Sequence, residues 1–151
     1  MFPQKHILIN LIISLIFLLF MPPTGVLIFF LSSFLIDVDH YIYYVIVKRK
    51  LSLKSAYNWF KIKHYKSLKL SVEERKKHRQ CIIFLHGIEP LLVIFLLSKV
   101  YPLLIYVVLG FTVHLIEDLY IERKLGTAMH KVSLIYSIYD HILKRKLKLF
   151  E

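Results

Sequence analysis

The 151-residue chain is poor in cysteine, glycine and acidic residues, and these shortages exclude several classes of protein. Its single cysteine, Cys81, leaves no intrachain disulfide and no cysteine pair for a zinc knuckle. Four glycines are too few for a glycine-rich nucleotide loop, and neither of the two common phosphate-binding loop patterns occurs. Only 10 Asp and Glu stand against 21 Lys and Arg, so the formal charge is +11 with neutral histidine, which indicates an anionic partner.

Apolar residues are abundant instead. They make up 57% of the chain, and the mean hydropathy is +0.58, which is too apolar for an ordinary soluble domain of this size. The length predicts a single domain over residues 1–151. In a soluble protein the positive charge would indicate nucleic acid. Beside long apolar runs, membrane lipids with anionic headgroups are the simpler partner, and nucleic acid is not expected.

Four apolar runs predict an all-α, polytopic membrane protein with about four transmembrane helices. The runs cover residues 6–21, 26–47, 81–98 and 103–121. The first is short for a span, and a signal peptide is the alternative. It ends in Met21-Pro22-Pro23-Thr24, however, which is not a small-residue cleavage site. We therefore expect a retained first span.

The basic segment 48–79 separates the second and third runs and holds 12 Lys and Arg but only two acids. It is either an amphipathic segment that binds anionic headgroups at the membrane surface, or a solvated loop whose charge only sets topology. The positive-inside rule places this loop and both termini in the cytoplasm. The last stretch, 128–150, predicts an amphipathic helix on the membrane surface.

Three of the four apolar runs contain clusters of acids and histidines, which are costly at membrane depth unless they are paired, hydrated or bound to a cation. The second run holds Asp37-Val38-Asp39-His40, the third holds His86 and Glu89, and the fourth holds His114 and Asp118. In the predicted topology all three clusters, and His6 in the first run, lie towards the cytoplasmic helix ends. Their common depth predicts one site that faces the cytoplasm.

The spacing within each cluster predicts shared helix faces. His114 and Asp118 are four residues apart, and His86 and Glu89 are three apart, so each pair can reach one ion. Asp39 is about 200° around a regular helix from Asp37. Either the helix is distorted there, or Asp39 serves a different ion or orients a histidine ligand.

These residues predict a two-metal site. The candidate ligands are His6, Asp37, Asp39, His40, His86, Glu89, His114 and Asp118. Their four carboxylates, at Asp37, Asp39, Glu89 and Asp118, are the candidate catalytic groups and balance two divalent cations. Mixed nitrogen and oxygen ligands suit zinc, with manganese or iron as alternatives. Two such ions activate water and hold a phosphoryl group for displacement. Glu117 either supports a metal ligand or only faces the helix bundle. His78 and Arg79 either contact a substrate phosphate or lipid, or merely carry charge.

At these residues the chain resembles the membrane-bound metal-dependent hydrolase family, whose bacterial prototype is a LexA-binding inner-membrane protein. The family's acidic motif, P-D-x-D-H, corresponds to residues 36–40 with Ile36 in place of proline, and its motif G-x-x-x-H-x-x-x-D corresponds to residues 110–118. The middle motif departs from the pattern: residues 85–89 read L-H-G-I-E, which is similar to an archaeal branch. The resemblance extends distantly to zinc phospholipase C and the S1/P1 nucleases, and it makes His6 the family's N-terminal histidine.

The expected function is therefore membrane-embedded hydrolysis of a phosphoester, with a lipid phosphoester as the candidate substrate. Two other classes remain open. One is a non-catalytic membrane module, either an ion or proton conduit or a partner-binding protein whose polar groups fix helix packing. The other is a di-iron oxidase, because histidine and acid pairs on helices also build such sites.

Overall fold

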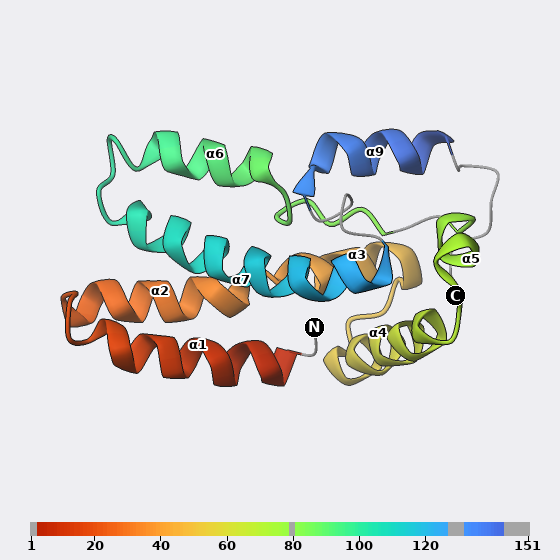
Figure 1. Ribbon diagram of the computed structural model, residues 1–151, viewed down its shortest axis with the longest axis horizontal. Coiled ribbons are helices and arrows are strands. Elements are labelled where there is room, and N and C mark those ends of the chain that lie inside the picture. The colour runs from red at the N-terminus through yellow and green to blue at the C-terminus, as the bar shows by residue number, and fades with distance from the viewer. Residues whose placement is uncertain (1–2, 79–80, 127–131, 144–151) are drawn as a thin grey trace.

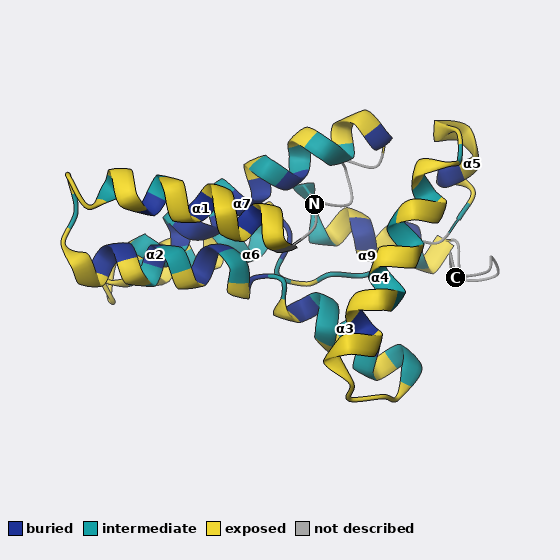
Figure 2. Ribbon diagram, turned by 90° about the horizontal axis from the view of Figure 1, so that it is seen from below, coloured by how far each residue is buried: buried dark blue, intermediate teal, exposed yellow. Residues whose placement is uncertain are grey.

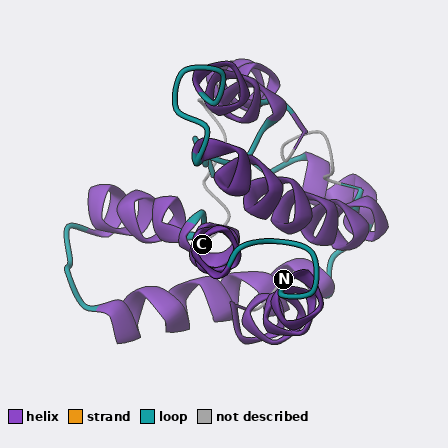
Figure 3. Ribbon diagram, turned by 90° about the vertical axis from the view of Figure 1, so that its left-hand side faces the viewer, coloured by secondary structure: helices purple, strands orange, loops and turns teal. Residues whose placement is uncertain are grey.

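The computed structural model describes residues 3–78, 81–126 and 132–143, and within these ranges it contains helices and loops but no strand (Figures 1 and 3). The expected all-α class is therefore confirmed. The helices are α1 (Pro3–Phe17), α2 (Pro23–Leu35), α3 (Val38–Lys48), α4 (Leu53–Leu68), α5 (Val72–Lys76), α6 (Ile88–Leu97), α7 (Leu104–Leu125) and α9 (Leu134–Leu143). Of the predicted amphipathic stretch 128–150, residues 128–131 and 144–150 lie outside the described residues.

Four helices, α1, α2, α6 and α7, run alongside one another and form a bundle (Figure 1). Helix α2 packs most extensively against α7, while α1 packs on α2 and α6 packs on α7. The turns that join α1 to α2 and α6 to α7 lie at one end of this bundle, and α3, α4, α5 and α9 gather towards the other end (Figure 1). The chain therefore has an apolar end and an end that carries its basic helices.

The predicted span 26–47 is divided between α2 and α3. Ile36 and Asp37 join the two helices. Ile36 has φ −54° and ψ −33°, and Asp37 has φ −69° and ψ −4°. Both residues thus stay in the right-handed region, but the regular helical pattern is interrupted and α3 turns away from the axis of α2 (Figure 2). Helix distortion, one of the two explanations offered for Asp39, is what the structure shows.

The predicted span 81–98 is helical only from residue 88, so the expectation of a helix over residues 81–87 is wrong. The cause is Pro90 in the first turn of α6. Proline has no amide hydrogen, and its ring would clash with the carbonyl group four residues earlier, which belongs to His86. Residue 86 consequently lies in a loop rather than on the helix that carries Glu89.

Two helical segments are long and apolar enough to cross a membrane, Pro23–Lys48 taken across its kink and Leu104–Leu125. The apolar helices Gln4–Phe17 and Ile88–Leu97 are shorter. Gly110 determines how closely α7 approaches α2, because a Cβ atom there would lie 2.2 Å from Ser32 Oγ and 2.6 Å from the Phe29 carbonyl oxygen. The small side chains of Gly110 and Ser32 therefore allow α2 and α7 to pack closely.

Burial on α1 is reversed relative to a helix of a soluble bundle, whereas α2 and α7 bury apolar side chains such as Phe29, Phe111 and Leu115. The buried face of α1 is polar, whereas its exposed face is apolar. The buried residues of α1 are His6, Asn10 and Ser14, and its exposed residues include Leu8, Leu11, Ile12, Leu15 and Ile16. Helix α9 repeats the pattern, with Ser137 and Asp140 buried and Ile135, Tyr139 and Ile142 exposed. Such an arrangement suits an apolar surrounding medium.

The described part of the basic segment, residues 48–78, folds into α4 and α5 rather than forming an open loop. Trp59 of α4 packs against Tyr44 of α3, with ring centroids 5.7 Å apart, and Lys63 Nζ lies 4.6 Å from the centroid of the Trp59 ring. Arg75 of α5 donates to the carbonyl oxygen of Leu125 at the end of α7. These contacts fix both helices at the polar end of the bundle.

Candidate metal centre

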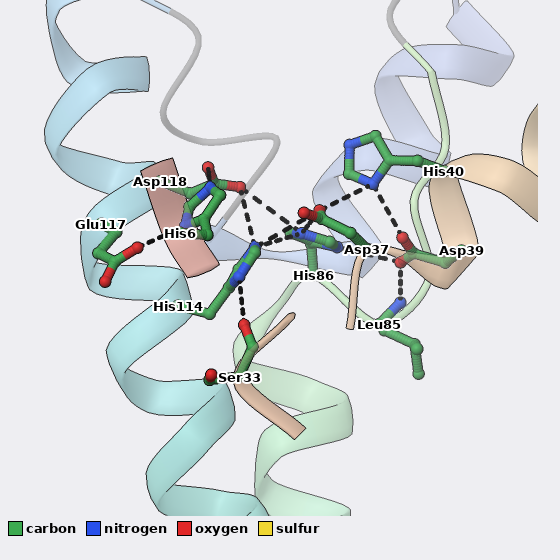
Figure 4. Close-up of polar contacts among 10 residues, drawn as sticks. All are labelled: His6, Ser33, Asp37, Asp39, His40, Leu85, His86, His114, Glu117 and Asp118. Atoms are coloured by element: carbon green, nitrogen blue, oxygen red, sulfur yellow. Dashed lines mark hydrogen bonds and ion pairs between the residues drawn. The ribbon is translucent and has the colours of Figure 1, made fainter. Parts of the chain in front are cut away.

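The structure brings seven of the eight predicted ligands together at the point where α1 begins and α2 ends (Figure 4). They come from α1, the junction of α2 with α3, the loop before α6, and α7. These residues are His6, Asp37, Asp39, His40, His86, His114 and Asp118. They form three overlapping groups that could hold a metal ion: His6 with His114 and Asp118, Asp37 with His86 and His114, and Asp39 with His40 and His86.

Four side-chain atoms at the middle of this cluster form a cage. His86 Nε2 lies 3.2 Å from His114 Nε2, and both nitrogen atoms lie 3.5 Å from Asp37 Oδ1. Asp118 Oδ2 lies 3.5 Å from His86 Nε2 and 3.6 Å from His114 Nε2. In a tetrahedral site with bonds of about 2.0–2.2 Å, ligand atoms are separated by about 3.3–3.6 Å. These nitrogen–nitrogen and nitrogen–oxygen separations are close to those that the ligand atoms of one tetrahedral zinc ion require.

Hydrogen bonds behind the cage orient both buried histidines. His86 Nδ1 donates to Asp39 Oδ2 at 3.0 Å, and the backbone amide of Leu85 donates to the same oxygen at 2.9 Å. His114 Nδ1 donates to the carbonyl oxygen of Ser33 at 2.7 Å. In each ring the Nε2 lone pair then faces the cage, as metal-bound histidine requires. Two such nitrogen atoms 3.2 Å apart repel each other unless a proton or a metal cation lies between them.

Asp39 thus lies behind the cage and orients His86, so the supporting role expected as the second alternative is present together with the helix distortion. His40 lies on the same side: its Nδ1 is 3.0 Å from Asp39 Oδ1 and 3.3 Å from Asp37 Oδ1. Phe60 of α4 packs edge-on against the His40 ring at 5.3 Å. The basic helix α4 therefore contacts the edge of the metal centre.

His6 lies on the opposite side of the cage. Its ring stacks on the His114 ring with centroids 4.1 Å apart, and its Nε2 atom lies 3.3 Å from Asp118 Oδ1. Its Nδ1 atom donates to Glu117 Oε2. Glu117 is consequently a support for His6, which was one of the two roles left open for it.

Glu89 does not join the centre, contrary to the prediction that it is a ligand and a catalytic carboxylate. Its Oε1 accepts from Ser133 Oγ at 2.6 Å, and its Oε2 accepts from the amide of Leu134 at 2.9 Å, at the start of α9. The predicted pairing with His86 required one continuous helix, and the helix begins only after His86. Glu89 therefore attaches α9 to α6. Arg79, the other uncertain group, lies outside the described residues.

Comparison of the chain with protein-family models, curated proteins and solved structures found no match. The functional inference therefore depends on the geometry of the centre.

Proposed function

We propose that the chain is a membrane-embedded, metal-dependent hydrolase that cleaves a phosphoester. The observation that carries this proposal is the cage formed by Asp37, His86, His114 and Asp118. Its nitrogen–oxygen separations are those of a tetrahedral site, and a hydrogen bond from the Nδ1 atom of each histidine orients the ring. Two imidazoles and two carboxylates favour zinc, with manganese or iron as the alternatives, and we expect two divalent ions per chain.

A divalent cation bound here would acidify a water molecule and withdraw charge from a phosphoryl oxygen. The residues around the cation would position the attacking water and accept its proton. The side chains of Asp37 and His40 are 21% and 23% exposed, whereas His86 and His114 are fully buried. Water and substrate therefore enter beside Asp37 and His40. We assign Asp37 to orienting the attacking water and His40 to accepting its proton.

The two alternative classes fit this geometry less well. A di-iron oxidase takes a Glu from each of two helices and a Glu-x-x-His pair from each of two others, and here Glu89 is held at the start of α9. An ion or proton conduit needs polar groups spaced along a path across the membrane. In this chain the ligand atoms gather in one place instead, and the nitrogen–oxygen separations in the cage are no greater than 3.6 Å.

We further propose that the protein crosses the membrane about four times, with both termini and the basic helices in the cytoplasm. The polar interior and apolar exterior of α1 support a lipid surrounding, although α1 is shorter than a typical span. The two turns at the apolar end of the bundle carry only one charge, Lys99, whereas the opposite end carries α4 and α5. The metal centre would then open towards the cytoplasmic leaflet.

The surface of α4 supports the proposal that the partner is a membrane lipid with an anionic headgroup. Its exposed surface combines lysines with apolar side chains, as expected of a helix that lies in the membrane interface. The exposed lysines are Lys54, Lys61 and Lys66, and the exposed apolar residues are Leu53, Tyr57, Ile62, Tyr65 and Leu68. Because Phe60 of the same helix touches His40, a phosphate bound along α4 would lie beside the open edge of the centre.

The test is release of phosphate or headgroup from a panel of phospholipids and prenyl phosphates by zinc-loaded protein, with and without chelator. We expect chelator-sensitive cleavage that is abolished by Asp37→Ala and by Asp118→Ala. Glu89→Gln is the matched control, because this carboxylate lies outside the centre. If loaded protein cleaves no member of the panel and chelator changes only its thermal stability, the metal is structural and the hydrolase assignment is wrong.

A further inference from the structure

Asn10 is an unusual residue in α1. Its side chain is 0% exposed, and neither its amide nitrogen nor its amide oxygen has a hydrogen-bond partner among the described residues. A buried carboxamide without partners is costly, and nearly all such groups in native proteins contact a protein group, a water or a ligand. The side chain of Asn10 therefore implies a bound group that the described residues do not supply.

The position of Asn10 links that bound group to the metal centre. Asn10 follows His6 by one helical turn and lies on the same face of α1, which places the two side chains about 5–6 Å apart at their Cβ atoms. The next residue on this face, Ser14, is also buried, but its hydroxyl donates to the carbonyl oxygen of Asn10 at 2.7 Å. The unpaired polar group is thus specific to the turn beside His6.

His6 is the second polar group beside this position. Its Nδ1 contacts Glu117, and its Nε2 lies 3.3 Å from Asp118 Oδ1, with which it forms an ion pair when the ring is protonated. His6, His114 and Asp118 also offer ligand atoms close enough together to hold one metal ion. A cation bound between His6 Nε2 and Asp118 Oδ1 would take the place of that proton.

We propose that His6 Nε2, Asp118 Oδ1 and Asn10 Oδ1 bind a second divalent cation. The proposal deepens the proposed function and depends on it, because Asp118 then bridges the two cations, with Oδ2 in the cage and Oδ1 on the second ion. Two of the three ligand atoms are oxygen, and one of these is a neutral carbonyl oxygen. The second site is therefore richer in oxygen ligands than the cage, which has two nitrogen and two oxygen ligands. It therefore suits Mn²⁺ better than the cage does and binds zinc less tightly.

Leucine at position 10 separates this role from simple packing, since Leu and Asn side chains are similar in size. Without metal, Asn10→Leu removes an unpaired buried amide, so the variant should melt at the same temperature as the wild type or higher. With both sites loaded, the wild type should gain more thermal stability than the variant, because only the wild type retains all three ligands. If Asn10 only packs, Asn10→Leu should shift the melting temperature in the same direction with and without metal.

The decisive experiment is a titration of Mn²⁺ into zinc-loaded protein, followed by the electron paramagnetic resonance signal of free Mn²⁺. We expect one Mn²⁺ per wild-type chain, affinity weakened at least about tenfold in Asn10→Leu, and binding retained in Asn10→Asp, which keeps a ligand oxygen. Ser14→Ala, one turn further along the same face, should bind as the wild type does. Zinc content is measured on every sample and shows that the cage is filled.

Equal Mn²⁺ affinity in wild type and Asn10→Leu would overturn the ligand role of Asn10. Filled zinc cages with no Mn²⁺ binding in the wild type would overturn the second site while leaving the proposed function in place. Wild-type protein that takes up no zinc would instead contradict the proposed function itself.

Discussion

Asp39 and His86, 47 residues apart in sequence, are joined by a 3.0 Å hydrogen bond, and solvent reaches neither side chain. This bond ties the beginning of α3 to the loop before α6, and it points the other ring nitrogen of His86 into the cage. The kink between α2 and α3 and the loop ahead of Pro90 are both needed for it. Two departures from regular helix thus converge on one histidine ligand.

Asp39→Asn should weaken metal binding without abolishing it. The amide keeps the shape of the carboxylate but loses the charge that holds the Nδ1–H group of His86. We expect the zinc affinity, measured by competition with a chromophoric chelator, to fall about 10–100-fold. His86→Ala should lose the cage ion altogether. Wild-type affinity in Asp39→Asn would show that this carboxylate does not support the site.

Gly110→Ala should destabilise the bundle and disturb the centre one turn away. The new methyl group would meet the Phe29 carbonyl oxygen and the Ser32 hydroxyl, so α2 and α7 must separate. We expect the free energy of unfolding in detergent to fall by roughly 1–3 kcal/mol, together with weaker zinc binding, because His114 loses its position against Ser33.

Gly25→Ala is the matched control for this change. The atoms nearest to a Cβ atom there belong to the ring of Tyr106, 2.5 Å away, and a side chain can move where a backbone carbonyl cannot. Its effect on stability should be smaller, and its zinc affinity should equal that of the wild type. Equal losses in both glycine variants would contradict the link between helix spacing and the metal centre.

Glu89→Gln should leave the metal content unchanged. The carboxylate of Glu89 accepts hydrogen bonds at the start of α9, and the amide can accept fewer of them. We expect a loss of about 1 kcal/mol in stability and faster reaction of a cysteine placed at Ser137, which is buried while α9 is docked. Loss of a metal ion in Glu89→Gln would restore the ligand role predicted from the sequence.

The basic helices should lie in the cytoplasm. Ser55, in the first turn of α4, is exposed, and a cysteine there reports the side of the membrane once Cys81 has been replaced by alanine. The Ser55→Cys thiol should resist an impermeant maleimide in whole cells and react after lysis. Labelling of intact cells would invert the topology and place the centre on the outer side.

The regular part of the centre was predictable from spacing alone. His114 and Asp118 lie one turn apart on α7, a continuous 22-residue helix, so their convergence follows from helical periodicity. Gly110, one turn before His114, is a small residue of the kind that allows close helix packing. At these positions local sequence and tertiary structure agree.

The irregular part was not predictable in the same way. The pairing of His86 with Glu89 assumed a helix through Pro90, and the missing amide of that proline was the signal against it. The link from His6 to Glu117 joins residues 111 positions apart, and nothing in their local spacing reveals it. Asn10 was visible as a lone amide in an apolar run, but only its burial and missing partners give it a role.

The most direct test of the metal centre is elemental analysis of protein purified without chelator, for the wild type and for His114→Ala. His114 contributes Nε2 to the cage and is fully buried, so its loss should remove the cage ion while Glu89→Gln retains it. We predict two transition-metal ions per wild-type chain, with zinc in the cage. Absence of any transition metal from the wild type, or full retention in His114→Ala, would contradict the metal centre.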